Sequence, residues 1–180
     1  VDRTASQQTQ NTPPNTYGVA AQMRSADPVS VDTLLLQRFP SLEPIRFYSA
    51  PRTRKRVTLV TDSISSGSLF GGVGTALIFG ALLAEKSDAD LRIITRTEAP
   101  NRSNFLSILR ANGVTFHRDV EFEFFPPTRT SPIDRAPKEG FISTSWWTTA
   151  SLSASVPTSA IVYVLQEDER LFYPNGDERL

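Results

Sequence analysis

Hydrophobic and polar positions follow one organised pattern from Val57 onward. Short apolar runs of strand length are separated by segments with helical spacing, as repeated strand–helix–strand units with a parallel sheet require. The pattern predicts strands at residues 57–64, 91–96, 120–125, 140–145 and 160–166. It predicts helices after a glycine-rich turn at 71–74, over 101–111 and after Trp146. The predicted fold class is therefore α/β.

The predicted elements differ in their expected surroundings. Residues 120–125 alternate glutamate with phenylalanine, which is typical of an edge strand with one wet face, whereas the other strands look buried on both sides. The apolar run 73–84 is too short to span a bilayer and is expected to form a buried helix. The helix over 101–111 has Asn101 or Ser103 as its N-cap and Asn112–Gly113 as its stop.

The segment before Val57 has a different character. Residues 1–16 are rich in Gln, Thr, Asn and Pro, so they are expected to be flexible. Ser30 can cap a short helix that ends before Pro40, and residues 45–51 look like an extended arm, so residues 28–54 hold a helix and an arm. We therefore divide the chain into an N-terminal extension, 1–54, and a Rossmann-like domain, 55–180.

A basic run, RTRKR, occupies residues 52–56 and has two interpretations. It could contact phosphate groups or a membrane surface, or it could be the solvated start of a buried strand. The second interpretation is favoured, because the run leads directly into the apolar residues that begin at Val57.

Composition excludes several classes of function. The chain has 180 residues, and its 19 basic and 19 acidic residues cancel, so nothing favours nucleic acid as a partner. Because cysteine is absent and His117 is the only histidine, thiolate and multi-histidine metal sites are excluded, and His117 is expected to be a partly exposed residue near a strand. No signal peptide, transmembrane segment or cofactor is predicted. A cytoplasmic location is expected, with the inner face of the membrane left open.

The glycine-rich turn is the first candidate for a ligand site. Gly71, Gly72 and Gly74 lack a Cβ, so the chain can turn tightly there and a ligand can approach the backbone. No G-x-G-x-x-G motif and no P-loop lysine can be placed on this segment, and Glu98, the nearest ribose-binding candidate, does not end its strand cleanly. A nucleotide site is therefore disfavoured, and close helix–strand packing remains an alternative explanation of the glycines.

Two further clusters follow predicted strands. Trp146 and Trp147 come after hydroxyl residues that include Ser145, and indole faces stack on the CH faces of sugars, although either tryptophan could instead fill the core. The second cluster is polar and acidic, and its carboxylates could bind sugar hydroxyls or act as a base, or simply form an exposed turn. Its candidate residues are Gln166, Glu167, Glu169 and Tyr173.

Three segments carry a resemblance to a known family. The stretches SGSLFGGVGTAL, FISTSWWTTASL and VYVLQEDERLFYPNG resemble the N-terminal domain of bacterial WsaF-type rhamnosyltransferases, over about residues 56–178. The resemblance implies the N-terminal half of a GT-B fold, a Rossmann-like parallel sheet with helices on both faces. It implies that Gly71, Gly72, Gly74 and Thr75 line the interdomain cleft, with Trp146 and Trp147 near the acceptor.

One motif departs from the family pattern, in which Gln-Asp-Tyr-Glu precedes Phe-Tyr-Pro. Here the four residues are Gln166, Glu167, Asp168 and Glu169. Glu167 therefore takes the acidic position and becomes the candidate catalytic residue. Asp168 replaces the aromatic residue, so no stacking role carries over to this position.

The resemblance implies a function that needs a second domain. In the family the N-terminal domain holds the acceptor glycan and the C-terminal domain binds the nucleotide-sugar donor, here expected to be dTDP-rhamnose. We expect the acceptor-binding half of an enzyme that builds a bacterial surface polysaccharide, inactive alone, with a cleft face able to self-associate. A nucleotide-binding Rossmann domain and a non-catalytic carbohydrate-binding module remain alternatives.

Overall fold

The computed structural model describes residues 30–69, 71–165 and 168. Five parallel strands form the main sheet in the order β4-β3-β2-β6-β7. The strands are β2 (Lys55–Thr61), β3 (Ala89–Thr95), β4 (Val120–Phe124), β6 (Gly140–Ser143) and β7 (Ile161–Tyr163). The predicted parallel α/β sheet is confirmed, and each of the five predicted strands is found.

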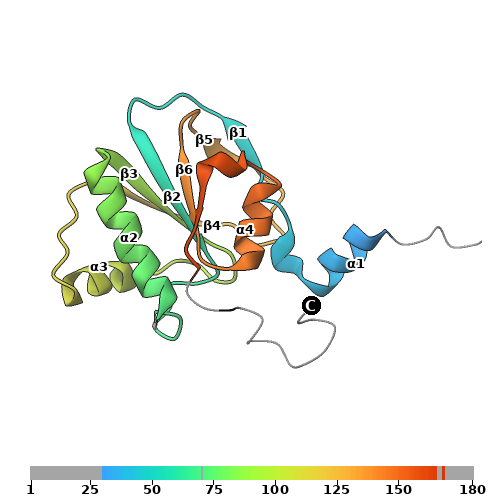
Figure 1. The fold of residues 1–180 in the computed structure, drawn as a ribbon, viewed down its shortest axis with the longest axis horizontal. Coiled ribbons are helices and arrows are strands. Elements are labelled where there is room, and N and C mark those ends of the chain that lie inside the picture. Colours follow the sequence, from blue (N-terminus) through green and yellow to red (C-terminus); the bar gives the residue numbers. More distant parts are fainter. Residues whose placement is uncertain (1–29, 70, 166–167, 169–180) are drawn as a thin grey trace, which may run out of the picture. The chain divides into compact units, whose positions relative to one another are not determined.

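Helices flank the sheet on both faces (Figure 1). The first face is covered by α2 (Gly72–Lys86) and α3 (Arg102–Ala111), and the second by α4 (Trp146–Ser153). Successive strand residues point to opposite faces, so Leu59 and Ile93 pack under α2 and α3 while Val60 and Ile94 pack under α4. The sheet is therefore the middle layer between two hydrophobic cores.

The predicted helix boundaries follow from capping residues. The Asn101 side chain accepts a hydrogen bond from the Ser103 backbone N–H and caps α3. The helix ends at Asn112, and Gly113 follows with φ at 67°. The prediction for this helix is confirmed at both ends.

Helix α2 is only half buried, which corrects the expectation of a buried helix. Gly80 and its neighbours on one face pack against the sheet, whereas Phe79 and Leu82 are 40% and 51% exposed. Within the described residues, no helix is long and apolar enough to cross a membrane.

The N-terminal elements include one pairing that the sequence did not predict. A short helix, α1 (Val31–Arg38), precedes the 3-10 turn η1 (Pro40–Leu42) and strand β1 (Phe47–Ser49). The predicted extended arm is this strand, and it pairs in parallel with β5 (Ile133–Arg135) as a small second sheet. A second 3-10 turn, η2 (Thr158–Ala160), leads into β7.

The strand surroundings correct two expectations. Strand β4 lies at an edge of the sheet as predicted, but its glutamates contact arginines: Glu121 pairs with Arg52 and Arg56, and Glu123 with Arg129. Strand β7, expected to be buried on both sides, forms the other edge, and Val162 is 47% exposed there.

The basic run at residues 52–56 was expected to be solvated, but its last residue, Arg56, is buried. The Arg56 side chain is fully buried and donates to Glu139 from Nε at 3.0 Å and from Nη2 at 2.8 Å. Arg92 donates to the same carboxylate at 2.6 Å from the neighbouring strand. Burial lowers the pKa of Arg56, but the opposing effect of Glu139, Glu121 and Asp134 is larger, so its pKa lies above the ordinary value. Arg54, by contrast, is 54% exposed as expected.

Candidate functional site

Loops after three neighbouring strands meet at the carboxyl edge of the sheet. The backbone N–H groups of Arg96 and Thr97, which follow β3, donate to the carbonyl of Asp62, which follows β2, at 3.0 and 2.9 Å. Thr144, after β6, donates from its hydroxyl to that of Thr61 at 3.1 Å. Because parallel strands deliver their carboxyl ends to one edge, residues far apart in the sequence converge there.

The glycine turn begins α2 at this edge, as predicted. Gly71 has φ at 76°, a left-handed conformation that favours glycine, and no side chain caps the helix. Gly72 is the first helical residue, and the hydroxyl of Thr75 donates back to the Gly71 carbonyl at 3.2 Å. A Cβ at Gly74 would meet the Leu69 carbonyl oxygen at 2.7 Å, so tight packing of the loop on the helix explains at least this glycine.

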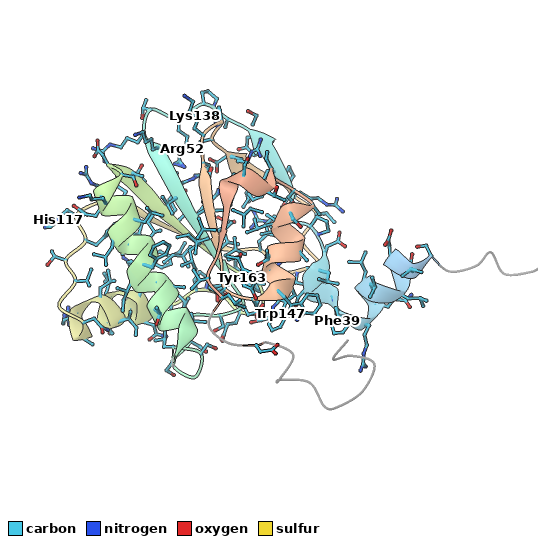
Figure 2. All side chains as sticks on the ribbon, in the orientation of Figure 1. Phe39, Arg52, His117, Lys138, Trp147 and Tyr163 are labelled. Carbon is cyan, nitrogen blue, oxygen red and sulfur yellow. The ribbon has the colours of Figure 1, made fainter. Side chains whose placement is uncertain are left out.

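The two tryptophans begin α4 and form an aromatic cluster with Phe39, and both are partly buried. Their ring centroids lie 5.7 Å apart in an edge-to-face arrangement, and Trp146 meets Phe39 in the same way at 5.6 Å. The indole Nε1 of Trp147 donates to Asp62 Oδ2 at 2.7 Å. Figure 2 shows Trp147, Tyr163 and Phe39 toward one end of the sheet and Arg52 and Lys138 toward the other.

Ser145 is the N-cap residue of α4, the helix that follows it. It is 5% exposed, and its hydroxyl accepts the Thr148 N–H while Thr148 Oγ1 accepts the Ser145 N–H. This reciprocal capping box fixes the start of α4 and hence the backbone of both tryptophans. A direct contact between Ser145 and a ligand stays a prediction.

Glu98 presents an ionised carboxylate at the same edge. It accepts a hydrogen bond from the Ser63 hydroxyl, and its own carbonyl accepts one from Thr95 Oγ1 at 2.6 Å. Hydrogen bonds from Ser63 and then Ser65 lower the pKa of Glu98, although slight burial acts in the opposite direction. The exposed carboxylate is therefore held as an acceptor of hydrogen bonds near neutral pH.

A buried cation lies beneath these loops. Arg96 is 0% exposed and donates to the carbonyls of Phe125 and Glu43 at 3.0 and 2.6 Å. Burial lowers the pKa of Arg96, and the charges of Asp62 and then Glu43 raise it in part. Because guanidinium stays protonated in proteins, the site contains a fixed positive charge close to Asp62.

Four predicted site residues fall outside the described part of the chain: Gln166, Glu167, Glu169 and Tyr173. Asp168 is described and exposed. Strand β7 ends at Tyr163, at the same edge as the Gly71 turn and the tryptophans. The structure therefore places the two tryptophans and the Gly71 turn at the same carboxyl edge of the sheet. The roles of the acidic cluster at residues 166–169 remain predictions.

Sequence reasoning missed Asp62 and the aromatic partner Phe39. Asp62 directly follows the buried strand β2, but the predicted strand 57–64 extends past it, so the strand-end rule used for the tryptophans did not single it out. Phe39 gave no comparable signal, because its contact with Trp146 depends on tertiary packing. His117 lies elsewhere, 70% exposed with its Nδ1 3.3 Å from Glu85 Oε1, as predicted for a residue near a strand.

Two hollows described by the structure lie away from this edge. One, of about 450 Å³, separates α3 from residues 113–120 and has Arg102, Arg110 and Arg118 in its wall. The other, of about 270 Å³, lies beside the basic run at the amino ends of β2 and β6. Neither includes a predicted site residue.

Fold and site define an α/β domain of the Rossmann-like class with polar and aromatic groups at the carboxyl ends of its strands. The family model of the WsaF N-terminal domain matches residues 56–177, and the chain belongs to this family. The expected resemblance is confirmed, and the chain is a glycosyltransferase domain, which implies sugar substrates. No curated protein matches the chain significantly.

Proposed function

We propose that this domain holds the acceptor glycan of a glycosyltransferase that transfers rhamnose from dTDP-rhamnose to a bacterial surface polysaccharide. The observation that carries the proposal is the tryptophan pair, anchored beside Asp62 at the carboxyl edge of the sheet. Aromatic rings that are fixed and partly exposed suit the CH faces of sugars. The family match supports sugar chemistry, because it covers the glycine turn, Asp62 and both tryptophans.

The proposed site has a stacking surface for the acceptor sugar and a catalytic carboxylate. Trp146 and Trp147 stack on the acceptor, while Gly71, Gly72, Gly74 and Thr75 border the cleft toward the donor. Glu167 is the proposed catalytic carboxylate that polarises the acceptor hydroxyl, with Gln166, Glu169 and Tyr173 beside it. The proposed domain boundary remains at residues 54 and 55.

The test uses the full-length enzyme that contains this domain, with acceptor and donor varied separately. Trp147→Ala should raise the acceptor KM about fivefold, since a stacking contact contributes on the order of 1 kcal/mol. Glu167→Gln should lower kcat, and neither variant should change the donor KM. Tyr48→Ala is the matched control, because Tyr48 is an aromatic residue on β1 that is 53% exposed.

Thermal melts of each variant exclude unfolding as the cause. Acceptor kinetics like those of the wild type in both variants would mean that the tryptophans only pack and that Glu167 lies outside the site. The proposal assigns donor binding to a second domain, so this domain alone should not transfer rhamnose. Transfer by the purified domain, or tight nucleotide binding to it, would contradict this division.

The proposal includes self-association of the isolated domain through its cleft face, which a donor domain would otherwise cover. Sedimentation at increasing concentration should show a species larger than the monomer. A monomer at all concentrations would contradict this part of the proposal alone.

A further inference from the structure

The indole of Trp147 makes a polar contact with the carboxylate of Asp62. The indole ring has a single donor, Nε1–H, and it is used by Asp62 Oδ2 at 2.7 Å. A carboxylate acceptor makes this bond shorter and stronger than a neutral one. Trp147 can therefore offer a ligand its ring but not its N–H.

The backbone of Asp62 is itself fixed. Its carbonyl accepts hydrogen bonds from Arg96 N–H at 3.0 Å, Thr97 N–H at 2.9 Å and Thr97 Oγ1 at 2.9 Å. These bonds tie the residue to the loop after β3, next to the buried Arg96 guanidinium. Asp62 is thus a rigid, negatively charged anchor rather than a mobile surface acid.

Trp147 has two further constraints besides this hydrogen bond. The capping box at Ser145 fixes the start of α4, and Trp146 meets the ring edge to face at an interplanar angle of 83°. A tryptophan side chain has two torsions with several preferred values, so the position of the backbone alone does not set the orientation of the ring. The hydrogen bond to Asp62 selects one orientation, because it requires the indole N–H to point at the end of β2.

We propose that Asp62 is a positioning residue that holds the Trp147 ring in the orientation that stacks on the acceptor sugar. This inference rests on the proposed acceptor-binding function. It also narrows the ligand chemistry. With the indole N–H already bonded, recognition at Trp147 uses the apolar CH face of a sugar ring, and acceptors with an extended CH face, such as deoxysugar residues, fit it best.

The first test is spectroscopic and needs no ligand. The chain has two tryptophans, Trp146 and Trp147, so selectively excited tryptophan emission reports on this cluster alone, and the tryptophan bands of the near-ultraviolet circular dichroism spectrum report on it beside signals from tyrosine and phenylalanine. Asp62→Asn keeps an acceptor oxygen and should retain the wild-type spectra. Asp62→Leu keeps a side chain branched at Cγ but has no acceptor, so it should weaken the coupled tryptophan signal and shift the emission maximum. Asp119→Leu, at an exposed position before β4, is the matched control.

The second test is kinetic and uses the full-length enzyme, with an α-linked rhamnose disaccharide as the acceptor probe. Asp62→Leu should raise the acceptor KM about fivefold and leave kcat and the donor KM within about twofold, the effect of losing one oriented stacking contact. Asp62→Asn should restore the acceptor KM. Trp147→Phe, which removes the N–H but keeps an aromatic ring, should also raise the acceptor KM, and Asp62→Leu should add little to it.

The outcomes separate this inference from the proposed function. Wild-type spectra in Asp62→Leu, or a loss of kcat at constant acceptor KM, would overturn the positioning role. If Asp62→Leu does not fold, Trp147→Phe decides: a wild-type acceptor KM there would also overturn it. If Trp147→Ala leaves the acceptor KM unchanged while Asp62→Leu alters the spectra, the proposed stacking surface for the acceptor fails and the Asp62–Trp147 anchor stands as a structural contact only.

Discussion

At the scale of single residues, Gly74 and Gly80, two of the three glycines of α2, have different reasons to be glycine. A Cβ at Gly74 would lie 2.7 Å from the backbone oxygen of Leu69, a group that cannot rotate away. A Cβ at Gly80 would meet only side-chain methyl groups of Leu59, Ile142 and Leu91 at 3.4–3.7 Å, which is ordinary contact. Glycine is therefore required by the loop at the first position and only tolerated at the second.

We predict opposite effects of alanine at these two positions. Gly74→Ala should lower the free energy of unfolding by about 1–3 kcal/mol, because the loop before α2 must move. Gly80→Ala should leave it unchanged or raise it by up to about 1 kcal/mol, since alanine favours a helix interior. Urea denaturation of the two variants measures both. Equal destabilisation would contradict the distinction.

A second residue-scale prediction concerns Glu98 and pH. Its pKa is lowered mainly by the Ser63 hydroxyl, so its ionised form contributes stability at neutral pH, and that contribution is lost as the pH falls through the lowered pKa. Ser63→Ala should move the pKa of Glu98 up toward its ordinary value, whereas Ser107→Ala on α3 should not. A carboxyl NMR titration measures the change. An unchanged pKa in Ser63→Ala would mean that Ser65 alone holds the carboxylate.

At the scale of elements, the Glu139 carboxylate joins the small sheet to the main one. It is fully buried and accepts hydrogen bonds from Arg56 on β2, Arg92 on β3, Thr58 and the Ala136 N–H. Arg56 and Arg92 also donate to the Asp134 carbonyl on β5 at 3.1 and 2.8 Å. The two arginines therefore hold β5 over the second face of the sheet, and β1 is held there through its pairing with β5.

Removing this carboxylate should destabilise the domain strongly. Glu139→Gln leaves two buried guanidinium groups with less compensation, and breaking a buried pair in this way costs about 3–5 kcal/mol. Glu85→Gln, which affects the exposed contact with His117, should change stability little. Chemical denaturation of the two variants tests the prediction, and a small effect at Glu139 would show that Glu121 and Asp134 compensate the arginines without it.

The limits of sequence-based prediction are visible in the same elements. The five strands of the main sheet were predictable because local apolar runs and helix caps mark them. Strand β5 has three residues, Ile133–Arg135, and pairs with a strand far away in the sequence, so no local pattern marks it. The burial of Arg56 depends on Glu139, 83 residues later, and no spacing rule links the two.

In the candidate site, too, the placement of segments was predictable from the sequence, but individual contacts were not. The positions of Gly71, Trp146 and Trp147 at the carboxyl edge follow from strand order, which the sequence pattern indicates. The bond between Asp62 and Trp147 joins residues 85 positions apart, and it depends on the register of β2 against β6. Individual contacts of this kind require the folded structure.

At the scale of the whole domain, stability should decrease from the centre of the sheet to its edges. β2 and β3 are paired on both sides and almost entirely buried, whereas β4 and β7 are edge strands. Hydrogen exchange should therefore be slowest in β2 and β3, faster in β4 and β7, and fastest in α1, which buries no residue. Exchange measured by mass spectrometry checks this order, and slow exchange in α1 would contradict it.

The buried arginines also constrain when the domain can fold during its synthesis. Strands β2 and β3 are synthesised before Glu139. In the folded domain these strands place Arg56 and Arg92 on the second face of the sheet, where Glu139 is their shared partner. Until that carboxylate arrives, closing this face would bury cations without their main partner, so the nascent chain should keep it open to water. We expect a ribosome-bound chain that ends near residue 125 to remain protease-sensitive, with protection gained only after β6 has emerged.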